Sequence, residues 1–336
     1  MSSALMGKIV FASGKLGDYD LWSLELATGE TRQLTRGNCW NDKPKWSPDG
    51  RRVVYTSNCG VPVGQEIFTV DAQGGKPVQL TRLGRWADSP DYSPDGSRIA
   101  FISNEAGNND VWVMNADGGD RTQVTTHRGS DNHVRWTPDG RGLLFSSDRG
   151  EDADIWHIDL SSGAKKQLNE DRGADITPVP SPDGELVAFV SNRQFEPDPK
   201  DPDSDRDKDV WLMTADGRFP TRLTGNQEAD FSPCWSPDGT HILYTADRGT
   251  MDCHLRTVDV TELRAAYRSG DAGQITREVE RLRHLEVEYD REGMKADIQA
   301  ERNKGLLTFW MPERWVRFLY PAGHFGKERN PDWVRS

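Results

Sequence analysis

Short runs of apolar residues recur along the chain and are separated by turns of the form Ser/Thr-Pro-Asp-Gly. In such a turn proline presets φ and glycine supplies a positive φ. A continuous apolar run follows each turn, as at 99–102, which is the pattern of a strand buried on both faces. An alternating segment such as 110–114 comes next, and the unit ends in Gln-Leu-Thr or a relative. We therefore expect four strands per unit, named a to d.

The unit recurs with a nearly constant period. The last residue of strand a is Trp46, Tyr92, Trp136, Pro180 and Trp235 in successive copies, which gives spacings of 46, 44, 44 and 55 residues. Such a period is typical of a propeller blade. A four-stranded sheet repeated radially buries its faces against its neighbours, and a closed ring leaves only short protected edges.

The five repeated segments resemble the TolB-type propeller repeat, the Ser-Pro-Asp-Gly relative of WD repeats. They are KWSPDGRRVVYTSN (45–58), DYSPDGSRIAFISN (91–104), RWTPDGRGLLFSSD (135–148), VPSPDGELVAFVSN (179–192) and CWSPDGTHILYTAD (234–247). The resemblance covers about residues 7–260 and implies a propeller that, in TolB itself, binds a partner protein over the channel mouth. The family also includes propellers of prolyl-oligopeptidase-type peptidases and some oligogalacturonate lyases. This sequence has no Gly-x-Ser-x-Gly elbow, and the metal-binding histidines of the lyases do not map onto it.

The number of blades follows from the two ends of the chain. The N-terminal segment supplies strands b, c and d of one more blade, around 9–13, 20–22 and 33–35, but no strand a. The C-terminal segment 328–335 ends in a Pro-x-aromatic pattern like the other a strands, so we expect it to complete that first blade. The prediction is an all-β, six-bladed propeller of four-stranded blades, formed as a single domain by residues 1–336 and closed by its C-terminal strand.

An acidic insertion at 194–209 lengthens the fifth blade. It carries alternating aspartates that resemble the opening of a calcium loop: Asp201, Asp203, Asp205 and Asp207. Alternate carboxylates of a curled loop can converge on one Ca²⁺ ion. However, position six of the motif is Arg206 and position twelve is Leu212, where a calcium loop has Gly and a bidentate Glu. A calcium site and a solvated acidic loop therefore both stay open.

A second insertion, 261–327, elaborates the sixth blade. Residues 274–286 have apolar positions at helical spacing and predict a helix. Residues 285–300 fit either a continued helix or a hairpin. The aromatic segment 306–325 is either an exposed binding or oligomer surface or the outer strand of the blade with packing for the helix.

Composition narrows the class of protein. The net charge is −12 and the pI is about 5.1, and this surplus of acid disfavours nucleic acid and anionic membrane surfaces as partners. Mean hydropathy is −0.76, and no apolar run approaches the roughly 20 residues of a membrane span. Residues 1–12 lack the basic and apolar regions of a signal peptide, so we expect a cytoplasmic protein.

The starts of the a strands should line the channel mouth, because strand a is innermost in a propeller. The acids expected there as ligand-binding residues are Asp42, Asp88, Asp131, Asp175, Asp230 and Glu328. Such a ring would concentrate negative potential and favour a metal ion, a cationic peptide or a polyol. The alternative is structural, since an aspartate at a strand start also ties adjacent blades by hydrogen bonds.

Four histidines are expected on the same face as these acids and are candidates for catalysis: His127, His133, His254 and His324. His254 takes the place of the acid that begins strand c in the other blades, so it can bind a divalent transition metal or move protons. Two functions follow. The first is a binding module for a protein or extended small ligand at the channel mouth, and the second is a metal-assisted carbohydrate lyase or hydrolase. Whether the chain is an enzyme stays open at this point.

Two cysteines should face each other in the second blade. Cross-strand partners about the turn at 47–50 have residue numbers that add up to about 97 or 98, and Cys39 and Cys59 add up to 98. We therefore expect their Cα atoms roughly 4.5 to 5.5 Å apart, which overlaps the disulfide range.

Overall fold

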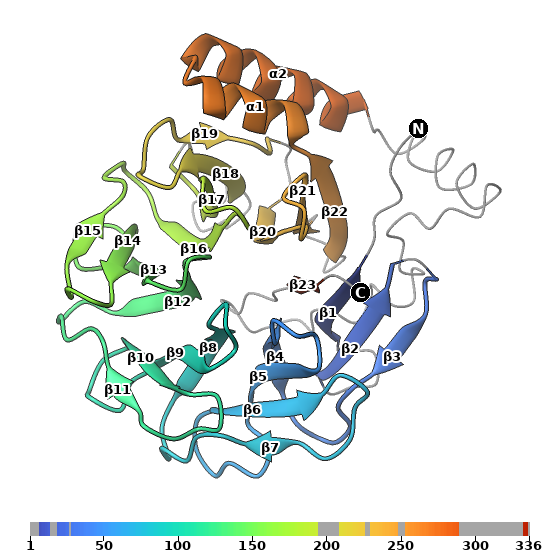
Figure 1. Cartoon of the computed structure of the whole chain (residues 1–336), viewed down its shortest axis with the longest axis vertical. Helices are drawn as coiled ribbons and strands as arrows, with labels where there is room; N and C mark the ends of the chain where they lie inside the picture. Colours follow the sequence, from blue (N-terminus) through green and yellow to red (C-terminus); the bar gives the residue numbers. More distant parts are fainter. Residues whose placement is uncertain are drawn as a thin grey trace, which may run out of the picture.

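Six antiparallel sheets surround a central axis in the computed structural model (Figure 1). The structure describes residues 7–13, 19–26, 28–193, 208–225, 229–247, 253–288 and 332–334. Within these residues five sheets have four strands and the sixth has three. The six-bladed, all-β fold predicted from the repeat is confirmed.

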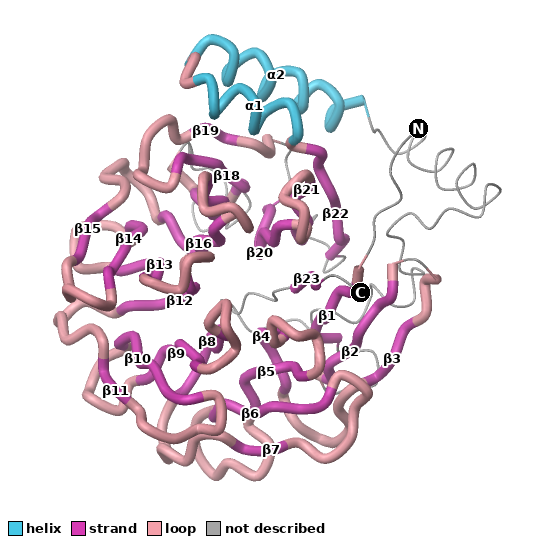
Figure 2. Tube along the Cα trace, in the orientation of Figure 1, coloured by secondary structure: helices cyan, strands magenta, loops and turns pink. Residues whose placement is uncertain are grey.

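Each blade takes its strands in order from the axis outward (Figures 1 and 2). Blades one to three are β23 (Asp332–Val334), β1 (Lys8–Ser13), β2 (Asp20–Glu25), β3 (Thr31–Gln33); β4 (Asn41–Trp46), β5 (Arg52–Ser57), β6 (Glu66–Asp71), β7 (Val78–Gln79); and β8 (Ala87–Tyr92), β9 (Arg98–Ser103), β10 (Asp110–Asn115), β11 (Thr122–Gln123). Blades four to six are β12 (Asp131–Trp136), β13 (Gly142–Ser147), β14 (Asp154–Asp159), β15 (Lys165–Gln167); β16 (Asp175–Pro180), β17 (Leu186–Ser191), β18 (Asp209–Thr214), β19 (Thr221–Arg222); and β20 (Ala229–Trp235), β21 (His241–Asp247), β22 (Cys253–Asp259).

The repeated turns have one conserved hydrogen-bond pattern within the chain. In blade two the Ser47 hydroxyl donates to Asp49 Oδ1 at 2.6 Å, and the Arg51 N–H donates to the same oxygen at 3.0 Å. Gly50 has a φ of 66°, as the turn requires. The hydrogen bond from Ser47 and that from Arg51 hold the pKa of Asp49 below its usual value. The matching Ser/Thr to Asp contact is 2.6 to 2.7 Å in the other four turns.

These turns all lie on one face of the ring, which we call the bottom face. Because neighbouring strands are antiparallel, the b–c loops and the connections from strand d to the next strand a lie on the opposite, top face. The b strands are almost wholly buried, as their apolar runs predicted. Their side chains pack between adjacent sheets, for example Val10 of blade one against Val53 and Tyr55 of blade two.

The C-terminal strand closes the ring. β23 pairs antiparallel with β1, with Trp333 opposite Ile9 and Asp332 opposite Val10. The predicted origin of the missing innermost strand is therefore confirmed, although the described part is only three residues long.

Two helices follow blade six and lie outside the ring (Figure 2). They are α1 (Thr261–Ser269) and α2 (Ala272–Glu288), and α2 contains the predicted helix 274–286. Helix α1 was not predicted, although Leu263, Ala266 and Tyr267 are buried at helical spacing. The 289–300 part of the helix-or-hairpin question and the aromatic segment 306–325 lie outside the described residues. Neither α1 nor α2 has the length and apolar character of a membrane span.

Candidate functional site

The predicted channel-mouth residues occupy the first two positions of the innermost strands. The first position holds Asn41, Asp131 and Asp175, and the second holds Asp42, Asp88 and Asp230. All but Asp88 are buried, with 0 to 3% of their surface exposed. Glu328 lies outside the described residues. Burial makes the contacts of these side chains within the protein decisive for what they can bind.

Residues at the first position of the innermost strands take part in hydrogen bonds that join adjacent blades. Between blades one and two, the Thr35 hydroxyl donates to Asp20 Oδ1 at 3.0 Å and accepts from the Leu21 N–H at 2.9 Å. The Asn41 amide donates across the junction to the Tyr19 carbonyl at 2.9 Å. Similar Thr to Asp or Glu contacts recur at Thr81, Thr125 and Thr224. These observations agree with the structural alternative for the first position.

Two acids of the predicted ring are paired with arginines of their own blades. Arg149 Nη2 contacts both carboxylate oxygens of Asp131, at 2.8 and 3.0 Å, and Arg193 Nη2 contacts Asp175 at 2.6 Å. The Arg149 guanidinium also lies 4.5 Å from the centre of the Trp156 ring. The negative charge of these two acids is therefore largely compensated before any ligand arrives.

A lysine bridges the channel-mouth starts of blades two and three. Lys43 Nζ donates to Asp88 Oδ2 at 2.8 Å and to the Ser89 hydroxyl at 3.1 Å, and the Thr56 hydroxyl donates to Asp88 Oδ1 at 3.0 Å. Burial raises the pKa of Asp88, but the Lys43 ammonium and these hydrogen bonds outweigh it, so the pKa lies below its usual value. Asp88 is thus an ionised, paired carboxylate near neutral pH.

Two acids of adjacent blades, Asp154 and Asp175, lie near enough to influence each other electrostatically. Burial and the neighbouring Asp175 carboxylate raise the pKa of Asp154 to about 6. Burial also raises the pKa of Asp175 to about 6, against the lowering effect of Arg193. Asp154 Oδ1 and Asp175 Oδ1 are buried and have no hydrogen-bond partner among the described residues. These two groups therefore retain protons at higher pH than ordinary aspartates do.

Every described innermost strand from blade two to blade six contains a β-bulge, at its third position in blades two to five and at its fourth in blade six. In blade two, Lys43 and Pro44 together stand opposite the single Tyr55. The bulged residues are in the left-handed region, with φ between 50° and 54°: Lys43, Ser89, His133, Thr177 and Ser232. Non-glycine residues adopt this conformation at a cost, and bulges re-aim side chains beside functional sites. The repeated bulges fix the shape of the channel wall, and the pattern of the repeat did not predict them.

The four candidate histidines do not form one described cluster. His133 Nδ1 is 2.8 Å from the Ser146 hydroxyl, and His127 Nδ1 accepts from the Gly129 N–H at 3.0 Å. His254 pairs with Ala246 in the sheet, but the surroundings of its side chain lie outside the description, as does His324. Among the described residues, no group of three or more His, Cys, Asp or Glu side chains could hold a metal ion. Catalytic roles for these histidines stay a prediction.

The proposed calcium ligands Asp201, Asp203, Asp205 and Asp207 lie outside the described residues. Asp209 begins β18 and is 2.7 Å from Arg222 Nη2, so it belongs to the sheet. The calcium hypothesis for the acidic loop therefore stays a prediction.

A firmly anchored loop projects from the top face of blade two. This b–c loop, 58–65, which we call the blade-two loop, is joined at its start to the preceding connection by a Cys39–Cys59 disulfide with a Cα separation of 5.0 Å. The predicted facing of the two cysteines is thus confirmed. At its other end, Gly64 (φ 84°) lies so close to the Arg85 carbonyl that an added Cβ would be 2.1 Å from that oxygen.

The blade-two loop exposes an apolar side chain. Val61 packs against the core between blades one and two, whereas Val63 has 70% of its surface exposed. The Asn58 side chain accepts from the Trp40 N–H at 2.7 Å, and the Ala87 N–H donates to the Gln65 carbonyl at 2.8 Å. The sequence signal for this exposed loop is the Val-Pro-Val-Gly segment between strands b and c, which was not among the predicted site residues.

Comparisons with known proteins agree with this fold. Residues 85–198 match the family model described as TolB beta propeller domain. TolB from Acinetobacter baumannii has a TM-score of 0.62 and 23% identity over 76% of this chain, and the match spans 62% of the length of that protein. A provisionally assigned TolB from Agrobacterium tumefaciens has a TM-score of 0.58 and 20% identity, covering 76% of this chain and 86% of that one.

A chain of a nidogen/laminin complex is similar to the same degree, with a TM-score of 0.58 and 12% identity over 74% of this chain and 88% of that one. No curated protein matches the sequence significantly. The protein is a six-bladed β-propeller. It carries TolB-type propeller repeats, as the repeated turns predicted.

Proposed function

We propose that this propeller is a binding module that recognises a partner protein through its top face. The observation that carries the proposal is the blade-two loop, which holds Val63 70% exposed on a segment fixed at both ends. A rigid loop loses little conformational entropy on binding, so the free energy of its apolar contact contributes nearly in full to the affinity. The match of residues 85–198 to the TolB beta propeller domain supports a protein as the ligand, because the resemblance of the repeats implies a propeller that binds a partner protein.

The neighbouring channel mouth adds polar groups to the same face. Lys43, Asp88 and Ser89 form one hydrogen-bonded cluster at the start of blades two and three. Protein interfaces commonly have an apolar centre and a polar rim, and the exposed Val63 beside this polar cluster fits that pattern. We therefore expect the interface to be centred on blades two and three.

Site-specific photocrosslinking tests this proposal. A photoreactive amino acid in place of Val63 should give a discrete adduct with one protein in an extract of the source cells. Val78 is the matched control, because it is 55% exposed on β7 of the same blade but lies on the outer strand. Adducts of the same pattern at both positions, or none at Val63, would contradict a top-face interface.

The disulfide supplies a second arm of this test. Replacing Cys39 and Cys59 by serine removes the covalent anchor of the blade-two loop. The adduct at Val63 should then weaken while the chain still folds, because the disulfide closes a loop of only 20 residues and contributes on the order of 3 kcal/mol at most. An unchanged adduct yield would show that anchoring of the loop is irrelevant to binding.

The alternative function, a metal-assisted carbohydrate lyase or hydrolase, has no specific support among the described residues. Its candidate groups His254 and His324 lie where side chains are not described. Metal analysis of the purified protein, with His254→Ala as the comparison, is the measurement that separates the two functions.

A further inference from the structure

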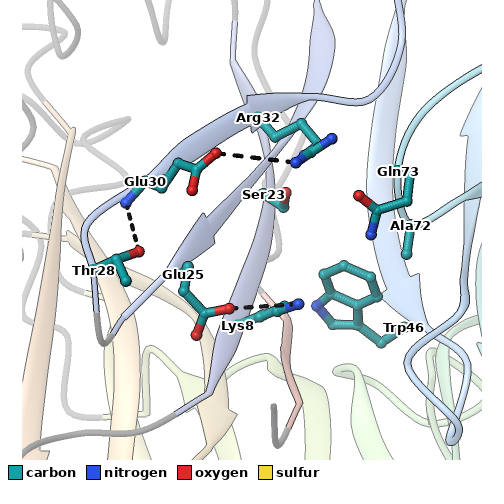
Figure 3. Close-up of a pocket in the computed structure, with 9 residues that line it drawn as sticks. All are labelled: Lys8, Ser23, Glu25, Thr28, Glu30, Arg32, Trp46, Ala72 and Gln73. Atoms are coloured by element: carbon teal, nitrogen blue, oxygen red, sulfur yellow. Dashed lines mark hydrogen bonds and ion pairs between the residues drawn. The ribbon is translucent and has the colours of Figure 1, made fainter.

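A pocket of about 450 Å³ opens between blades one and two on the bottom face (Figure 3). Blade one lines it with Lys8, Ser23, Glu25, Thr28, Glu30 and Arg32, and blade two with Trp46, Ala72 and Gln73. Trp46 directly precedes the bottom turn at 47–50, and Ala72 and Gln73 follow β6, so the pocket lies on the face opposite the blade-two loop. Its volume is within the usual range for small-molecule sites.

The charged side chains of this pocket are only loosely paired. Lys8 Nζ is 3.4 Å from Glu25 Oε2, and Arg32 Nη2 is 4.0 Å from Glu30 Oε1. Both distances exceed those of ordinary N–H···O hydrogen bonds, about 2.7 to 3.2 Å. The paired Lys43 and Asp88 at the top face are 2.8 Å apart by comparison. The four groups of the pocket therefore keep unused donors and acceptors.

The internal repeat shows how this junction differs from the junction between blades three and four. Lys8 begins β1 opposite Glu25, and at the same place in blade three Arg98 begins β9 opposite Asn115. Arg98 lies 4.5 Å from the centre of the Trp136 ring and so occupies the space before that tryptophan. In blade one the Glu25 carboxylate draws the Lys8 ammonium toward itself instead. Trp46, the counterpart of Trp136, lines the pocket.

The chemistry of the lining selects the ligand. Two cations and two carboxylates cancel, so the pocket favours neither an anion nor a cation. Hydroxyl groups donate and accept at once, so one hydroxyl can bridge a carboxylate and a neighbouring cation. Ser23, Thr28 and Gln73 add neutral polar groups, while Trp46 and Ala72 form an apolar wall. We infer that this pocket binds a neutral carbohydrate of one or two sugar units.

Saturation-transfer NMR on the full chain tests the inference with a panel of neutral sugars: glucose, N-acetylglucosamine, maltose, lactose and cellobiose. Glycylglycine and citrate serve as zwitterionic and anionic probes. At least one sugar should bind at millimolar concentration, and neither charged probe should displace it. Failure of every sugar to bind, or binding of a charged probe alone, would overturn the inference.

Variants locate the binding. The double substitution Lys8→Arg and Glu25→Asn copies the blade-three arrangement and should place a guanidinium over Trp46, which weakens sugar binding at least about tenfold. Gln73→Ala, at an exposed position on the opposite wall, should weaken it as well without risk to folding. Unchanged binding in both folded variants would overturn the assignment to this pocket.

Two matched controls keep the result distinct from the top-face proposal. Glu105→Gln removes another loose ion pair, 3.8 Å from Arg121 on blade three, and should leave sugar binding unchanged. Val63→Asp should abolish the partner interaction but not sugar binding, because Val63 lies on the opposite face. Loss of sugar binding in either control would contradict the pocket.

Discussion

At the scale of single residues, similar aspartates behave differently because their neighbours differ. Both carboxylate oxygens of Asp131 accept hydrogen bonds from Arg149 Nη2, and Asp88 is paired with the Lys43 ammonium. Asp154 instead lies near Asp175, and the pKa of each is raised to about 6. The ionised Asp175 carboxylate disfavours the ionisation of Asp154, so this junction between blades four and five should weaken when both lose their protons.

We expect Asp154→Asn to raise the melting temperature at pH 8. The folded pKa of Asp154, about 6, lies above the ordinary value of 3.8, so its protonated form contributes stability that is fully present below pH 3.8 and lost as pH rises through 6. The amide resembles the protonated acid, so the gain should shrink toward zero near pH 4. Differential scanning fluorimetry from pH 4 to pH 8 measures it.

Asp95→Asn is the matched control for this prediction. Hydrogen bonds from Ser93 and Ser97 lower the pKa of Asp95 to about 2, so its ionised form is the stabilising one. This variant should lower the melting temperature at pH 8. A shift of the same sign in both variants would refute the role of the raised pKa.

At the scale of elements, the bulge in each innermost strand sets the shape of the channel wall. Proline follows the bulged residue in four of the five described cases, as at Pro44 and Pro233, because a proline at a bulge need not donate to the ladder. Ser232 is the extreme case, since it is fully buried and its hydroxyl has no hydrogen-bond partner among the described residues.

Ser232→Gly should therefore stabilise the protein by up to about 1 kcal/mol. Glycine relieves the left-handed backbone (φ 53°) and removes the unsatisfied hydroxyl, while it costs some entropy in the unfolded chain. Ser232→Ala removes only the hydroxyl and keeps the unfavourable backbone, so it should gain less. Urea denaturation measures both, and a larger gain for alanine than for glycine would argue against the backbone strain.

Helix α1 is held to the bottom turn of blade five by an arginine pair. Arg264 is buried, donates to the Gly239 carbonyl, pairs with Asp183, and lies 5.7 Å from the centre of the Trp235 ring. Arg268 contacts the same turn on its exposed side. Its side chain is 57% exposed, and its Nε lies 2.7 Å from Glu185 Oε2.

Arg264→Ala should lower the free energy of unfolding by about 3 kcal/mol, because it removes a buried guanidinium together with its pairing to Asp183 and its hydrogen bond to the Gly239 carbonyl, while only the exposed Arg268 still contacts Asp183 among the described residues. Arg268→Ala should cost less than about 1 kcal/mol, since exposed ion pairs contribute little. Urea denaturation of the two variants gives the comparison, and equal losses would show that α1 does not depend on the buried guanidinium.

At the scale of the whole molecule, stability depends on closing the ring. β23 joins the C-terminus to β1 next to the N-terminus, through three residue pairs. Without it, β1 presents an unpaired edge, and blade one loses the strand that contacts β20 of blade six, so that among the described residues only the packing of Ile9 and Phe11 against Cys234 and Leu243 still joins the two blades. The short closing strand therefore links the two ends of a chain whose other blades contact only their neighbours.

A chain that ends at residue 331 should melt at a markedly lower temperature and aggregate on heating. The control ends at residue 334 and so retains β23. Static light scattering during a thermal ramp measures both effects. Equal melting temperatures for the two truncated chains would refute closure by β23.

Much of this architecture could be predicted because the signals are local and repeated. Turn chemistry, apolar b strands and the spacing of Trp46, Tyr92 and Trp136 predict the blades. Three strands without a strand a at the N-terminal end, and one unmatched strand at the C-terminal end, predict the closure. The facing of Cys39 and Cys59 follows from counting residues about one turn. Helix α1 was missed because the repeat led us to expect an outer strand after blade six.

The sequence by itself determined the repeat, the number of blades and the strand that closes the ring, since each is signalled by a local pattern that recurs along the chain. Only the tertiary structure decided which acids are paired, because Lys43 and Asp88 are 45 positions apart and meet across two blades. It also decided that Arg98 lies over the Trp136 ring, whereas Lys8 lies beside Glu25. That difference depends on whether Glu25 or Asn115 stands opposite the cation, and a charge in one strand acts on another only after the sheet has formed.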